Sequence, residues 1–163
     1  MAAVTMKKCF EVMIMTIRNM SLNDYDEVYA LWAAAPGVGV NDFDDSVKGI
    51  AKYLARNPRT CFVAEKDGKI VGAVLGGHDG RRGTICHLAV AESHNKQGIG
   101  TALVDAALAA LQNEGIRKVW LVVMADNAQG NTFWEKQGFE KRDDIYYRNK
   151  VIIEEQYAKN SCC

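Results

Sequence analysis

The sequence predicts an α/β fold in which a central mixed sheet carries helices on both faces. Two observations lead to this fold class. Strand-like and helical segments alternate along the chain, and a glycine-rich turn after a strand opens a long amphipathic helix. The 163 residues correspond to one domain, and no repeat or low-complexity segment divides them. A chain of this length buries about 68–70% of its unfolded surface, so a full core requires neither disulfides nor metals.

Capping and turn signals define the first half of the chain. Ser21 with Asp24 three residues later is a variant of the capping box. Asp44 or Asp45 is expected to cap the second helix, and the run 66–69 is a strong hairpin turn signal. The expected elements are a strand at 16–19, a helix from 22 to about 35, a helix around 47–54, and strands at 60–65 and 70–75.

Glycine stops and apolar runs define the second half. Gly115 ends a long helix and Gly138 a shorter one. The apolar run 118–124 is typical of a strand buried on both faces, while His78 and Asp79 are expected in a glycine-rich turn. The expected elements are a strand at 84–90, a helix at 98–114, a strand at 118–124, a helix at 127–137 and a final hairpin at 139–151.

Composition excludes several classes of function. Twenty basic and twenty acidic residues cancel, so the chain lacks the net field typical of nucleic-acid-binding and membrane-surface proteins. Its five cysteines form no Cys-x-x-Cys pair and, with the three histidines, no zinc pattern. Scattered thiols are typical of a reducing compartment. We therefore expect a cytoplasmic protein with no metal, no nucleic-acid partner and no membrane association.

Both ends of the chain are expected to lie outside the domain. Lys7 and Lys8 precede a short apolar stretch, but Glu11 interrupts it and no small-residue cleavage site follows, which argues against export. Met15 begins the first strand-like stretch and is a candidate for the natural start of translation. We expect an N-terminal extension over 1–14, the folded domain over 15–153 and a C-terminal tail over 154–163.

One segment carries a signal for ligand binding. After a strand that ends at 88–90, Gly98 and Gly100 stand at the start of the long helix. Glycines at this spacing let backbone N–H groups approach a ligand, and a helix N-terminus favours an anion such as a pyrophosphate. In isolation, a tight strand-to-helix turn explains the same glycines equally well. The third glycine of a Rossmann site and the Gly-Lys-Ser/Thr ending of a P-loop are missing.

The residues that follow the long helix extend this signal. Asn127, Gly130, the pair 133–134 and the pair 138–139 come after the apolar strand. Together with 88–101, this arrangement resembles the GNAT superfamily of N-acetyltransferases over about 84–139, and the order of elements agrees from about 16 to 151. The glycine-rich stretch 76–83 is similar to a small bacterial subgroup with unassigned acceptors. The resemblance implies the GNAT (acyl-CoA N-acyltransferase) fold and acetyl-CoA as cosubstrate.

The resemblance also implies which residues bind acetyl-CoA. The backbone of 88–90 is expected to pair with the pantetheine arm, and the amides of 95–101 are expected to hold the pyrophosphate. Asn127 would hydrogen-bond the pantetheine, Phe133 and Trp134 would flank the arm near its sulfur, and a backbone amide near Leu88 would stabilise the oxyanion. The implied set is Leu88, Ala89, Val90, Asn95, Lys96, Gln97, Gly98, Ile99, Gly100, Thr101, Asn127, Phe133 and Trp134.

Two positions depart from the family's pattern. Asn95 stands where arginine or glutamine is usual, and Trp134 where many members carry a tyrosine thought to protonate the leaving thiolate. An indole N–H is a donor only and no useful acid. Tyr146 or Tyr147 on the expected last strand is therefore the candidate acid, unless the thiolate leaves without help.

The general base is unassigned, because the glutamate that the family often places before Leu88 is absent. His87 is the candidate base, since its ordinary pKa suits proton transfer, and a packed structural histidine is the alternative. Strand alternation predicts that His87 lies on the face opposite Cys86 and Leu88. Cys86 is expected to be a small core hydrophobe, and Trp32 is expected in the core.

The acceptor is expected to enter between the first two helices and the last hairpin. Asn41 and Asp42 lie near that entrance, where a carboxylate attracts a cationic amine. We expect direct acetyl transfer to a primary amine of a small molecule or peptide, in a ternary complex without an acyl-enzyme. The alternatives are a non-catalytic acyl-CoA-binding or sensing module, and another nucleotide-binding protein that uses the same glycine loop. Homodimers are common in the family, but no residue pattern specifies one here.

Overall fold

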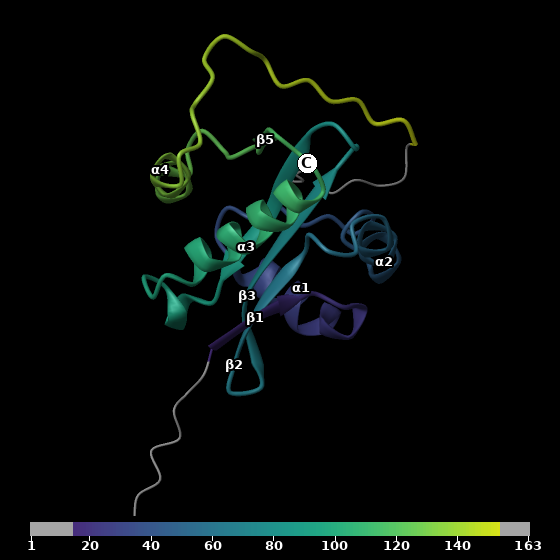
Figure 1. Cartoon of the computed structure of the whole chain (residues 1–163), viewed down its shortest axis with the longest axis vertical. Helices are drawn as coiled ribbons and strands as arrows, with labels where there is room; N and C mark the ends of the chain where they lie inside the picture. The colour runs from purple at the N-terminus through teal and green to yellow at the C-terminus, as the bar shows by residue number, and fades with distance from the viewer. Residues whose placement is uncertain (1–14, 154–163) are drawn as a thin grey trace, which may run out of the picture.

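The computed structural model describes residues 15–153, and their central sheet confirms the predicted α/β fold. Its strands lie side by side in chain order (Figure 1), antiparallel from β1 to β4 and parallel between β4 and β5. The extension expected over 1–14 and the tail expected over 154–163 lie outside the described residues. The strands are β1 (Met15–Asn19), β2 (Phe62–Lys66), β3 (Lys69–His78), β4 (Gly83–Val90) and β5 (Val119–Trp120).

Helices cover both faces of this sheet, with α1 and α2 on one face and α3 on the other (Figure 1). Within residues 15–153, no helix is long and apolar enough to cross a bilayer. The helical elements are the 3-10 turn η1 (Leu22–Asp24), α1 (Tyr25–Ala34), α2 (Val47–Arg56), the 3-10 turn η2 (Glu92–His94), α3 (Ile99–Asn113) and α4 (Ala128–Lys136).

Each face of the sheet has its own core. On one face α3 buries Leu103 and Leu111 completely against β2, β3 and β4. On the other face Trp32 of α1 is fully buried with Val63 and Leu75, which confirms it as a core residue. Burying a side chain of this kind contributes about 1.5–3 kcal/mol. This packing holds α3 in place on the sheet, and the N-terminus of α3 faces the candidate site.

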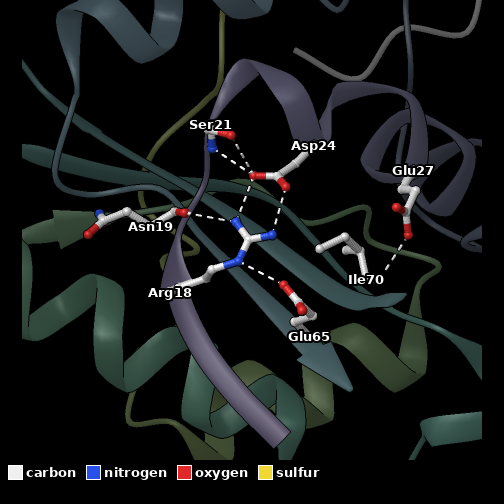
Figure 2. Close-up of polar contacts among 7 residues, drawn as sticks. All are labelled: Arg18, Asn19, Ser21, Asp24, Glu27, Glu65 and Ile70. Atoms are coloured by element: carbon white, nitrogen blue, oxygen red, sulfur yellow. Dashed lines mark hydrogen bonds and ion pairs between the residues drawn. The ribbon is translucent and has the colours of Figure 1, made fainter. Parts of the chain in front are cut away.

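A partly buried ion pair sets the corner between β1 and the first helix (Figure 2). The guanidinium of Arg18 donates to both carboxylate oxygens of Asp24, at 2.8 and 2.9 Å, and to Glu65 of β2 at 2.9 Å. The Asp24 carboxylate also accepts from the backbone N–H of Ser21 at 2.8 Å, which confirms the predicted capping-box variant. The hydrogen bond from Arg18 lowers the pKa of Asp24 in spite of its burial.

The second helix begins with a different cap from the one predicted. The hydroxyl of Ser46 accepts from the backbone N–H of Gly49 at 3.1 Å, so Ser46 is the N-cap of α2. Asp44 and Asp45 therefore do not cap this helix directly. The carboxylate of Asp45 turns inward and accepts from the backbone N–H of Asn41 at 2.8 Å.

Two predictions about the C-terminal part are wrong. Of the run 118–124, only Val119 and Trp120 pair with β4, and Trp120, Val122 and Met124 are exposed instead of buried. The hairpin predicted at 139–151 does not form, because no described residue from 137 to 153 is in a strand. The physical reason is common to both: β4 and β5 separate after one short contact, and no further strand lies beside β5 among the described residues.

Candidate active site

A cavity of about 1000 Å³ opens between the C-terminal half of β4 and the chain that follows β5. One wall is formed by 85–92 of β4 and its continuation, and a second by the start of α3. The third wall combines 122–124 with α4, and the loop 34–39 after α1 closes the opposite side. The cavity therefore joins segments that are up to about a hundred residues apart in the chain, at the place where two parallel strands diverge.

The backbone before α3 has the conformation that the glycine spacing predicts. Gly98 is the N-cap of α3 with φ of 80°, and Lys96 is also left-handed with φ of 61°. A Cβ added to Gly98 would meet no atom of the described chain within 4 Å, so the space beside it is open. Left-handed turns beside a helix N-terminus direct N–H groups to one side and form anion sites. This corner of the cavity is suited to a phosphate group.

Helix α4 supplies the polar and aromatic part of the opposite wall. Asn127 caps α4, because its side-chain oxygen accepts from the backbone N–H of Gly130 at 2.8 Å. Phe133 and Trp134 lie edge to face with ring centroids 5.0 Å apart, and both line the cavity. Trp134 also meets Phe139 edge to face at 5.2 Å. Asn127 therefore has a structural role in addition to the binding role that the family resemblance implies.

A bulge in β4 changes the alternation predicted for its side chains. Ala89 pairs with Ala73 and Cys86 with Leu75, so β4 has one residue more than β3 between these pairs. His87 takes up the extra residue with φ of 52°, a left-handed conformation that is rare outside glycine. Cys86 and His87 therefore lie on the same face, toward α1 and α2, whereas Leu88 packs toward α3. The prediction that Cys86 shares a face with Leu88 is wrong.

The His87 ring is held in a buried ion pair with Asp45. Its Nε2 lies 2.9 Å from Oδ1 of Asp45, and the two side chains are 8% and 5% exposed. The contact is an ion pair by distance, but Nε2 makes no hydrogen bond of good geometry with any residue of 15–153. Trp32 makes two contacts with His87. The two rings lie edge to face with centroids 4.8 Å apart, and the Trp32 Nε1–H donates to the His87 backbone carbonyl at 2.9 Å.

The charge state of His87 follows from this environment. Burial by itself lowers the pKa of a histidine, but the interactions with Asp45 and Cys86 outweigh it and raise the pKa of His87 to about 9. The imidazole is therefore protonated at neutral pH. A protonated ring cannot accept a proton, so this geometry favours a positioning role for His87 over the expected role of general base.

The structure brings most of the expected acetyl-CoA residues to one cavity. All of them line it except Gln97, whose side chain instead donates to the Ser93 carbonyl at 3.3 Å. Cys86 is half-buried and also lines the cavity, with the Tyr53 hydroxyl 3.9 Å from its sulfur. Asp79 lies in the predicted turn, where its carboxylate accepts from the N–H groups of Arg81 and Arg82. His78 is instead the last residue of β3 and pairs with Gly83.

The acceptor and acid candidates do not reach the cavity within this chain. Asn41 is buried and organises its own turn, where its side-chain oxygen accepts from the N–H groups of Phe43 and Asp44. Asp42 is exposed and lines no part of the cavity. Tyr146 and Tyr147 are also exposed and lie outside the lining.

Sequence reasoning missed two contributions to this site. The sequence predicts Asp45 as a candidate cap of the second helix, yet it is the partner of His87, 42 positions away along the chain. The loop 34–39 was treated as a connection, yet it forms a wall of the cavity. The glycines of this loop were a signal for close approach, since a Cβ on Gly37 would overlap the Asn127 side chain. Nothing in the local sequence signals the Asp45 contact.

Comparison with known proteins agrees with this geometry. Residues 25–139 match the model of the acetyltransferase (GNAT) family. An acetyltransferase of Sodalis glossinidius is 32% identical over 142 residues, which cover 87% of this chain and 99% of that protein. An acetyltransferase of Yersinia pseudotuberculosis is 31% identical over 143 residues, which cover 88% and 100%.

Solved structures share the fold. Ard1 from Thermoplasma volcanium superposes with a TM-score of 0.69 at 27% identity, over 77% of this chain and 82% of that one. The PaiA N-acetyltransferase from Thermoplasma acidophilum, solved in complex with coenzyme A, gives a TM-score of 0.71 at 18% identity, over 82% and 94%.

Proposed function

We propose that this chain, which belongs to the acetyltransferase (GNAT) family and is an acyltransferase, moves an acetyl group from acetyl-CoA to a primary amine. In this proposal the amine attacks the thioester directly, in a ternary complex, and no acyl-enzyme forms. The observation that carries the proposal is the cavity between β4 and the chain after β5, with the N-terminus of α3 at one end and the bulge of β4 in its wall.

The residues of this cavity suit acetyl-CoA. The left-handed turn at Lys96 and Gly98 is open and lies at a helix N-terminus, which fits a pyrophosphate. The continuation of β4 over 88–90 offers backbone groups to an extended pantetheine arm. Phe133 and Trp134 add an apolar wall of the kind that a thioester needs.

The bulge in β4 is the best candidate for the oxyanion site. A bulge leaves one residue out of the ladder between two strands, so its N–H is free to point at a ligand. Donors fixed in advance toward a developing oxyanion are the largest single contribution to catalysis in many enzymes. In this proposal the Asp45–His87 ion pair and the Trp32 hydrogen bond hold the bulge in place, so His87 is a positioning residue.

The amine must lose a proton before it attacks. A lysine-like amine has a pKa of about 10.4, so deprotonation at neutral pH costs roughly 4–5 kcal/mol. The protonated His87 is unsuited to take this proton, so another base or a water chain must accept it.

Two matched glycine variants test the acetyl-CoA site. Gly98 and Gly115 both have φ of 80°, and a Cβ at either would meet no atom within 4 Å. Gly98→Ala and Gly115→Ala therefore impose similar backbone strain, about 1–2 kcal/mol, but only Gly98 lines the cavity. We expect Gly98→Ala to weaken CoA binding by about tenfold or more, as when a hydrogen bond to a charged group is lost. Gly115→Ala should bind CoA as the native chain does.

Binding and turnover are measured separately. Thermal shifts are recorded with acetyl-CoA, CoA, ATP and NAD. A ligand at a hundredfold excess over its Kd adds about 2.7 kcal/mol, which is roughly 5–10 °C for a domain of this size. Release of free CoA is then followed with polyamines, peptide N-termini and lysine as acceptors. Binding without turnover of any amine would favour a sensing module, and a shift with ATP or NAD alone would overturn the proposal.

A further inference from the structure

Exposed cations gather at the end of the sheet where β3 turns into β4. Three segments meet there: 56–59 at the end of α2, the turn 79–82, and 114–118 before β5. The β2–β3 turn at 66–69 lies at the opposite end of the sheet (Figure 1). We call the exposed cations of the three segments the basic end, and they are Arg56, Arg59, Arg81, Arg82, Arg117 and Lys118.

Hydrogen bonds hold the three segments of the basic end together. The His78 N–H, just before the turn, donates to the Asn57 side chain at 3.2 Å. The Gly83 N–H, just after the turn, donates to the Lys118 carbonyl at 3.0 Å. A basic segment is therefore attached on each side of the turn, and the cluster is a fixed feature of the fold.

Most of this charge has no counter-ion within the described chain. The three segments contain six cations and two carboxylates, Asp79 and Glu114. Asp79 lies 3.9 Å from Arg81, and Glu114 lies 2.7 Å from Arg59. The remaining four cations form no ion pair with any residue of 15–153. The basic end therefore has an excess of four positive charges in contact with solvent.

Helix α2 extends the basic end along its exposed side. Lys48 and Lys52 precede Arg56 at intervals of four residues, so the three cations share one face of the helix, and all are exposed. Like charges at this spacing destabilise a helix. An anion bound along α2 would remove this repulsion, so the pattern indicates an anionic ligand.

The distribution of charge favours a short acidic polypeptide over a nucleic acid. The whole chain is neutral, so the positive excess at the basic end is matched by a negative excess elsewhere. A long phosphate backbone extends past a cluster of this size and meets the negative remainder. A segment with a few carboxylates meets only the cations. Five of the six are arginines, and a guanidinium can bind a carboxylate with two hydrogen bonds.

Strand β4 connects the basic end to the cavity. It begins at Gly83, beside the basic end, and reaches the bulge at His87 four residues later, which is about 13 Å of extended chain. Thr84 and Cys86 share one face of the strand, both are partly exposed, and Cys86 lines the cavity. An extended peptide on this face, with its amine at the bulge, brings roughly its fourth to sixth residues to the basic end.

We propose that the basic end recognises acidic side chains of a polypeptide acceptor, about four to six residues from the amine that is acetylated. This inference rests on the proposed acetyl transfer and selects among its acceptors. The same cations repel polyamines and basic peptides. Among the described residues that line the cavity, the only carboxylate is that of Glu92, which follows the other end of β4.

Three peptides with a free N-terminus test the preference. Each has three alanines, followed by four glutamates, four glutamines or four lysines, and release of free CoA gives kcat/KM. We expect the glutamate peptide to exceed the glutamine peptide by about tenfold and the lysine peptide to be the slowest. Raising the salt from about 0.1 M to 1 M shortens the Debye length from about 10 Å to 3 Å and should remove the preference. Equal values at low salt overturn the inference.

Charge reversal tests whether the basic end is responsible. Arg81→Glu combined with Arg82→Glu reverses the turn of the basic end. Lys66→Glu combined with Lys69→Glu makes the same change in net charge at the opposite turn. The first double variant should lose the preference for glutamate and the second should keep it, while circular dichroism and a thermal shift with CoA verify both proteins. A preference that survives in the first double variant overturns the inference.

A binding assay distinguishes failure of this inference from failure of the proposed function. The glutamate peptide with an acetylated N-terminus and a C-terminal fluorophore cannot be turned over, so its anisotropy reports docking alone. The Arg81/Arg82 double variant should bind it about tenfold more weakly than the native chain. Turnover of amines without such binding overturns the inference alone, whereas binding without turnover of any amine overturns the proposed function and keeps the docking surface. Tighter binding of a single-stranded oligonucleotide or of phosphatidylserine vesicles at the same salt overturns the acidic polypeptide as ligand.

Discussion

The buried ion pair between His87 and Asp45 predicts how stability depends on pH. The pKa of His87 is raised from 6.5 to about 9 in the folded chain, so the native state binds the proton more tightly than the unfolded state. This stabilisation is fully present below about pH 6.5 and is lost as the pH rises through about 9. The difference corresponds to about 3 kcal/mol, which is a large part of the stability of a typical domain.

Asp45→Asn removes the charge and keeps the shape. The asparagine oxygen can still accept from the backbone N–H of Asn41, so the turn before α2 is preserved. The buried imidazole then loses the carboxylate that favours its charged form. We expect the free energy of unfolding near pH 6 to fall by up to about 3 kcal/mol and its decline between about pH 6.5 and 9 to flatten.

Urea unfolding followed by tryptophan fluorescence measures both quantities at a series of pH values. Trp32 contacts the His87 ring, so its emission also reports on this region directly. Asp42→Asn is the matched control, because it makes the same substitution at an exposed carboxylate three residues away. If the native chain and Asp45→Asn show the same slope of stability against pH, the reasoning about the ion pair is refuted.

Three further predictions test the packing around the site. Leu103→Ala empties a fully buried position under α3 and should cost about 2–5 kcal/mol in urea unfolding, with CoA affinity retained; a cost well below 1 kcal/mol would contradict the core described above. Ser46→Ala removes the cap of α2 and should cost about 1 kcal/mol, whereas Ser46→Thr should cost much less. Trp32→Phe keeps the ring contact but removes the donor to the His87 carbonyl. It should lower kcat while the KM for acetyl-CoA stays within about twofold, and an unchanged kcat would show that the bulge does not need this bond.

Local signals in the sequence were sufficient wherever a feature is made by neighbouring residues. Ser21 and Asp24 form the expected capping box because both members lie within one turn. Gly98 adopts the left-handed conformation because that requirement belongs to the start of α3 itself. The motif residues from 88 to 134 converge on one cavity because the order of strand, turn and helix already constrains their placement.

Local signals failed where a long-range contact decides the outcome. Strand alternation misplaced Cys86 relative to Leu88, because a bulge depends on how β4 matches β3 and leaves no mark in its own sequence. The apolar pattern of 139–151 predicts a hairpin, but a strand forms only beside a partner, and no described residue from 137 to 153 is in a strand.

The sequence by itself determined the family, the α/β fold and the residues that gather around the cavity, because periodicity, caps and a glycine motif act over a few residues. Only the tertiary structure decided that Asp45 holds the charge on His87, that Asn41 and Asp42 stay away from the cavity, and that β5 has no outer neighbour among residues 15–153. These outcomes depend on which distant segments meet, and the free energy of such contacts is set by shared burial and geometry that no single stretch of sequence contains.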